Sequence, residues 1–126
     1  VLSWIENHIC LAPMFPRREG VSVVEGKTID KQKVMRLADA AERCWQAIIA
    51  KNLDAFAHAY ADSFAAQVAM FPAMMQPGVA EHIERWKNAG ALAWKMCGAG
   101  GGGYLALVFD KIPQNEPLKR IKIRRQ

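Results

Sequence analysis

The chain has 126 residues, of which 52% are hydrophobic and 23% charged, and its net charge is +5 at pH 7 with neutral histidine. These values predict one globular domain and argue against a membrane span, because no apolar run approaches the roughly 18 residues that a span needs. Cys10, Cys44 and Cys97 are odd in number and far apart, which is typical of reduced thiols in the cytoplasm. The positive charge favours an anionic partner without choosing its class.

The first predicted element is a strand of about six residues within residues 5–14. These residues are rich in apolar and β-branched side chains, and the strand is expected to stop at Pro13. A surface loop with the sequence FPRREG follows over residues 15–20. Because the first residue is valine rather than methionine, and because the opening segment runs straight into a strand, we expect the chain to be the C-terminal part of a longer protein.

Two long helices are predicted next, each preceded by a residue suited to an N-cap. Asp30 precedes a helix that reaches about residue 50, and Asn52 precedes a second helix that ends before Pro72. Three- and four-residue spacing predicts the buried face of the first: Val34, Leu37, Ala38, Ala41, Trp45 and Ile48. The stripe of the second is Leu53, Phe56, Ala57, Tyr60, Ala61, Phe64 and Val68. Only two residues separate the helices, so they should pack as an antiparallel hairpin.

A short helix and three strands are predicted for the rest of the chain. Pro77 lies in the first turn of the helix and Gly90 ends it. We expect strands over residues 91–97, 104–109 and 118–124, the last half-exposed. With helices in the middle and strands at the end, the order βαααβββ favours a two-layer α+β sandwich with an antiparallel four-stranded sheet and helices on one face. No histidine has a histidine partner at helical spacing, so no metal site is expected.

The most informative stretch is residues 98–103, in which five of six residues are glycine. Glycine is the costliest residue to order, so such a run needs a reason. Either the backbone adopts angles that other residues avoid, or a second object approaches too closely for a Cβ atom. We interpret the stretch chiefly as the second case, as part of a ligand pocket; a ligand-free glycine hairpin is the alternative.

Two common phosphate-binding motifs do not fit this stretch. Its letters satisfy G-x-G-x-x-G, but a dinucleotide fingerprint opens a helix, whereas this one opens a predicted strand that is soon followed by Pro113. A Walker A loop is excluded because Tyr104 stands where its lysine should follow the last glycine.

Residues 95–105, KMCGAGGGGYL, resemble the C-terminal glycine motif of the GHMP kinases, which is similar to K-x-[ST]-G-A-G-G-G-G-[CF] between two strands. The element order is also similar, so the resemblance implies that residues 1–126 are a ferredoxin-like GHMP kinase C-terminal domain. Cys97 departs from the pattern, since serine or threonine is usual there and a thiol is a poor hydrogen-bond partner. The FPRR segment and the Tyr104-Leu105 continuation look most like the branch that phosphorylates fucose or heptose sugars.

The resemblance implies an ATP-dependent kinase that transfers the γ-phosphoryl group to a hydroxyl of a small substrate, here a sugar, with Mg²⁺. The family's phosphate loop and catalytic residues belong to an N-terminal domain absent from this sequence. We therefore expect that domain as partner, ATP and Mg²⁺ bound mainly by it, and an inactive isolated chain without catalytic residues. By resemblance, the residues beside the substrate and the phosphate loop are Cys97, Gly98, Ala99, Gly100, Gly101, Gly102 and Gly103. Arg17 and Arg18 could contact substrate; the alternative is two solvated charges.

A different class of function rests on the cations near the C-terminus: Lys119, Arg120, Lys122, Arg124 and Arg125. They would suit a non-catalytic α+β module that binds anions or nucleic acid through a basic face. No exposed aromatic side chains are interleaved with them, so we favour protection of a sheet edge over nucleic-acid binding.

Overall fold

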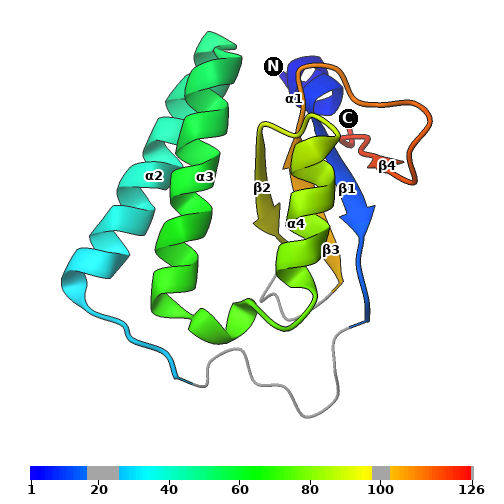
Figure 1. Cartoon of the computed structure of the whole chain (residues 1–126). Helices are drawn as coiled ribbons and strands as arrows, with labels where there is room; N and C mark the ends of the chain where they lie inside the picture. Colours follow the sequence, from blue (N-terminus) through cyan, green and yellow to red (C-terminus); the bar gives the residue numbers. More distant parts are fainter. Residues whose placement is uncertain (17–25, 98–102, 126) are drawn as a thin grey trace.

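A computed structural model describes residues 1–16, 26–97 and 103–125 (Figure 1). The elements in chain order are α1 (Leu2–His8), β1 (Ile9–Pro13), α2 (Lys31–Ala50), α3 (Leu53–Met70), the 3-10 turn η1 (Pro72–Met74), α4 (Val79–Asn88), β2 (Ala93–Met96), β3 (Tyr104–Val108) and β4 (Lys119–Arg120). All strand pairs are antiparallel, in the order β2-β3-β1-β4. The predicted α+β class and four-stranded antiparallel sheet are confirmed. In the described ranges, no helix combines the length and apolar character needed to cross a membrane.

The α2–α3 hairpin begins and turns where the sequence predicts. The Asp30 carboxylate accepts from the Lys33 amide at 2.8 Å and the Asn52 side chain accepts from the Ala55 amide at 3.1 Å, so both N-caps are confirmed. Between the helices Lys51 adopts a left-handed conformation with φ of 52°, which turns the chain within two residues. The two helices lie side by side and antiparallel in Figure 1.

The predicted buried face of α2 is mostly wrong: Leu37 and Ile48 are half-buried, but the other four predicted residues are exposed. Its buried residues are Ala40 and Ala47, whereas Val34 is 48% exposed and Trp45 is 53% exposed. Helix α2 packs chiefly on α3, and a close contact between two helices favours small side chains, so Val34 and Trp45 lie on the outer side. The stripe of α3 is largely correct, with Ala61 exposed as the exception.

The apolar core lies on both faces of the sheet. Leu105 and Leu107 of β3 belong to a cluster that contains Trp86 of α4, whereas Val108 belongs to a second cluster with Phe56 of α3. Successive residues of a strand point to opposite faces, so the two clusters lie on opposite sides of β3. Helix α4 belongs to the first cluster, whereas α3 contributes to both, with Phe64 in the first and Phe56 in the second.

Three predicted boundaries need correction. The first strand begins only at Ile9, because the four residues before it belong to α1. Pro77 precedes the helix instead of lying in its first turn, because Gly78 with φ of 95° is the N-cap of α4. The last strand is only two residues long, although its flanking residues keep the predicted alternation of half-buried and exposed positions.

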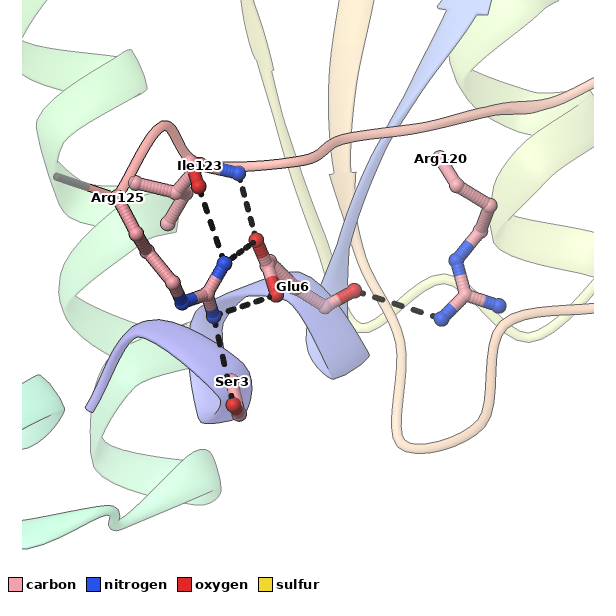
Figure 2. A network of polar contacts seen from close by, with 5 residues as sticks. All are labelled: Ser3, Glu6, Arg120, Ile123 and Arg125. Carbon is pink, nitrogen blue, oxygen red and sulfur yellow. Dashed lines mark hydrogen bonds and ion pairs between the residues drawn. The ribbon is translucent and has the colours of Figure 1, made fainter.

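Helix α1 is held by the other end of the chain. The Glu6 carboxylate accepts from the Ile123 amide at 2.6 Å and from both terminal nitrogens of Arg125 at 2.9 Å, while the Glu6 carbonyl accepts from Arg120 at 3.5 Å (Figure 2). Arg125 also donates to the Ser3 hydroxyl at 3.4 Å. We call Glu6, Ile123 and Arg125 the terminal clasp.

The terminal clasp predicts a specific loss of stability in acid. Hydrogen bonds from Arg125 and then from the Ile123 amide lower the pKa of Glu6 from 4.5 to about 2. The folded-state pKa lies below the ordinary value, so the stabilisation is complete above about pH 4.5 and is lost as pH falls toward 2. Thermal unfolding of Glu6→Gln should therefore show a lower Tm than the unsubstituted chain at pH 7, with the difference shrinking below pH 4.5. Glu84→Gln, at an exposed position of α4, is the control; a constant Tm difference for Glu6→Gln at all pH values would contradict the prediction.

Candidate functional site

The candidate site is the end of the sheet where β2 and β3 join the glycine stretch. The Cys97 amide donates to the Tyr104 carbonyl at 3.1 Å, which extends the β2–β3 pairing by one residue. On the other side, the Gly103 amide donates to the Phe15 carbonyl at 2.7 Å and the Met14 amide donates to the Gly103 carbonyl at 2.8 Å. The ends of β1 and β2 and the start of β3 therefore lie at the same end of the sheet (Figure 1).

The structure places only part of the predicted site. Cys97 and Gly103 lie at this end of the sheet, directly after β2 and directly before β3. The remaining residues, Gly98, Ala99, Gly100, Gly101 and Gly102, lie outside the described residues, as do Arg17 and Arg18.

Gly103 needs glycine for its backbone conformation. Its φ is +84°, in the left-handed region that L side chains rarely adopt, and a Cβ atom added there would meet no described atom within 4 Å. At this position our interpretation that close approach dominates is not supported within the described chain. The backbone angle is the reason that the structure shows.

The side chain of Lys95, two residues before Cys97, links this end of the sheet to α3. Its Nζ donates to the Ser63 hydroxyl at 2.6 Å, and Ser63 is 4% exposed. Desolvation by burial lowers the pKa of Lys95. Because the two residues are 32 positions apart, no local pattern predicts this pair; the signal that could have found it is a serine among the apolar and alanine residues of a buried helix.

A family model described as GHMP kinases C terminal matches residues 37–121, which is more than half of the chain. The chain belongs to the GHMP kinase family. Its fold is similar to that of mevalonate kinase from methicillin-resistant Staphylococcus aureus MRSA252, with a TM-score of 0.62 and 19% identity. The match covers 86% of this chain and 35% of that kinase, and at this identity it shows a shared fold alone. A search of curated proteins found no match.

Cys97 occupies the position where the GHMP kinase motif usually has a hydroxyl side chain. The residue is exposed overall, yet surrounding atoms still desolvate its thiol enough to raise the pKa of Cys97. Because the thiolate is the reactive form, this shift argues against a nucleophilic role.

A pocket lined by three polar residues of α4 lies near Phe15. The ring of His82 on α4 lies 6.0 Å from that of Phe15, whose carbonyl receives the Gly103 hydrogen bond. A pocket of about 220 Å³ is lined by Glu81, His82 and Arg85. Such side chains offer both donors and acceptors to a hydroxylated ligand. In the ranges that the structure describes, however, no three His, Cys, Asp or Glu side chains are grouped to hold a metal ion.

Proposed function

We propose that residues 1–126 are the C-terminal domain of an ATP-dependent kinase that phosphorylates a hydroxyl of a small molecule. The observation that carries this proposal is the glycine stretch of a GHMP kinase domain. Gly103, its last residue, is hydrogen-bonded at one end of the sheet. In this role the stretch forms one wall of the cleft, and residues 97–103 border the transferred phosphoryl group. Phosphoryl transfer depends chiefly on positioning the reacting groups, and the hydrogen-bonded end of the sheet can hold the glycine stretch in place for this.

ATP and Mg²⁺ are proposed to be bound mainly by an N-terminal kinase domain. The described residues do not fit a metal site by themselves, because they lack a cluster of suitable ligands. Members of the family supply their phosphate loop and catalytic residues from that other domain, so the isolated 126-residue chain is expected to be inactive.

We further propose a sugar as substrate. The support is the pocket lined by Glu81, His82 and Arg85, which lies near Phe15, together with the similarity of the FPRR segment to fucose and heptose kinases. Arg17 and Arg18 are proposed substrate contacts because only Pro16 separates them in sequence from Met14 and Phe15, whose backbones pair with Gly103.

The alternative of a basic binding face is weakened by internal contacts. Lys119 donates to the Tyr104 hydroxyl at 2.8 Å, and Arg120 and Arg125 both donate to Glu6. Three of the five cations that suggested this function are therefore engaged within the chain.

A substrate screen of the full-length protein tests the proposal. ATP consumption should be stimulated by fucose or a heptose phosphate, and less by galactose or mevalonate. A phosphate loop upstream of Val1 should accompany this activity. Stimulation by mevalonate alone would overturn the sugar assignment, whereas no phosphoryl transfer to any hydroxyl compound would overturn the kinase proposal. The 126-residue chain is the matched control and should show no activity.

A further inference from the structure

A second pocket, of about 300 Å³, lies where α2, α3, β1 and β2 come together. Much of its wall is apolar, with Ile9, Ile48 and Phe56 among the lining residues, and Tyr60, Ser63 and Lys95 supply polar atoms. The volume is at the lower end of the roughly 300–1,000 Å³ typical of small-molecule sites. Its lining shares no residue with the polar pocket beside Phe15.

Lys95 is the one charged group among the described residues that line this pocket. Burial raises the pKa of both Cys44 and Tyr60, so these lining side chains stay neutral at physiological pH. The pocket therefore combines a single positive charge with an otherwise neutral surface.

The Lys95 ammonium group pairs with no carboxylate of the described chain; its hydrogen-bond partner is the neutral Ser63 hydroxyl. Asp62, which directly precedes Ser63 in the sequence, already forms an ion pair with Arg43 at 2.9 Å. A partly desolvated cation without a counter-ion is unfavourable, and an anion placed against it would relieve that cost.

We propose that this pocket binds an amphipathic monocarboxylate, a molecule with one anionic head and a short apolar tail. The head would accept hydrogen bonds from Lys95 and from the Ser63 hydroxyl, which can donate its proton because it accepts from Lys95. The tail would lie between Ile9, Ile48 and Phe56. A single cation in a small pocket does not suit a polyphosphate. This inference is independent of the kinase proposal.

Calorimetric titration of the full-length protein with octanoate tests the inference. Octanamide, which has the same tail without charge, and acetate, which has the head alone, should each bind at least about tenfold more weakly. Lys95→Met should weaken octanoate binding by about tenfold or more and leave octanamide binding unchanged. Lys87→Met, at an exposed lysine of α4, is the matched control and should bind octanoate like the unsubstituted protein.

A second variant tests the apolar part of the pocket. Ala41 lies on the lining, and Ala41→Phe should fill the space and weaken octanoate and octanamide together. Circular dichroism establishes that each variant is folded; if Lys95→Met is not, Ala41→Phe and the octanamide comparison decide. Absence of saturable octanoate binding, equal binding of octanamide, or unchanged affinity in a folded Lys95→Met variant would each overturn the proposal.

Discussion

Trp86→Ala is expected to lower the free energy of unfolding of the 126-residue chain by about 3–5 kcal/mol. Trp86 is 1% exposed and lies in the larger apolar cluster, where α4 packs on Leu105 and Leu107 of β3. Removing the indole leaves a cavity that the surrounding sheet and helices can fill only in part. Because domains of this size are stable by only about 5–15 kcal/mol, the variant should unfold at a much lower urea concentration, followed by circular dichroism.

Two further variants separate the loss of packing from other effects. Trp45→Ala removes the same side chain from an exposed position of α2 and should change stability by less than about 0.5 kcal/mol. Trp86→Phe should cost much less than Trp86→Ala, because the buried Trp86 Nε1 has no hydrogen-bond partner among the described residues and its removal forfeits none. Equal losses for Trp45→Ala and Trp86→Ala would contradict the assigned core.

The second large effect is expected at the base of the glycine stretch. Gly103→Val should reduce kcat/KM for phosphoryl transfer by the full-length protein about 100-fold or more, because small displacements of a positioning element cost rates of this order. At φ of +84° valine is strained, so the chain should rotate out of the conformation that pairs Gly103 with Met14 and Phe15. The measurement is steady-state kinetics with the substrate that the screen identifies.

Gly90→Val is the matched control for strain. Gly90 follows α4, has φ of +106°, and an added Cβ atom would likewise meet nothing within 4 Å. Both variants should lose stability by about 1–3 kcal/mol, but only Gly103→Val should lose activity beyond the fraction unfolded. Equal effects on activity would show that the end of the sheet near Gly103 has no special role in phosphoryl transfer.

Local signals predicted the helical hairpin well because they are contained in few residues. Asp30 and Asn52 each satisfy an amide three positions later, so the start of each helix depends on neighbours in sequence. Helix α1 was missed because its N-cap position, Val1, makes no side-chain cap and its Glu6 is held by Arg125 from the far end of the chain. No local pattern contains that contact.

The faces of α2 and the surroundings of the candidate site were harder to predict. Apolar residues occur on two sides of α2, and only the packing partner decides that Ala47 is buried while Trp45 is exposed. At the site, the glycine pattern located the hairpin and suggested the family, but the Lys95–Ser63 link required the α3–β2 contact to be known. Periodicity describes one element at a time, whereas sites are made between elements.

The strand order has a consequence for how the domain is made. Strand β1 pairs with β3 on one side and with β4 on the other. Ile9 can therefore pair only after Val108 has emerged from the ribosome, and Cys10 can complete its pairing only after Arg120 has emerged. The α2–α3 hairpin, whose contacts are local, can form during translation, whereas the sheet closes only when nearly the whole segment is available. A nascent chain stalled before β3 should therefore expose the first strand to chaperones while its helices are already folded.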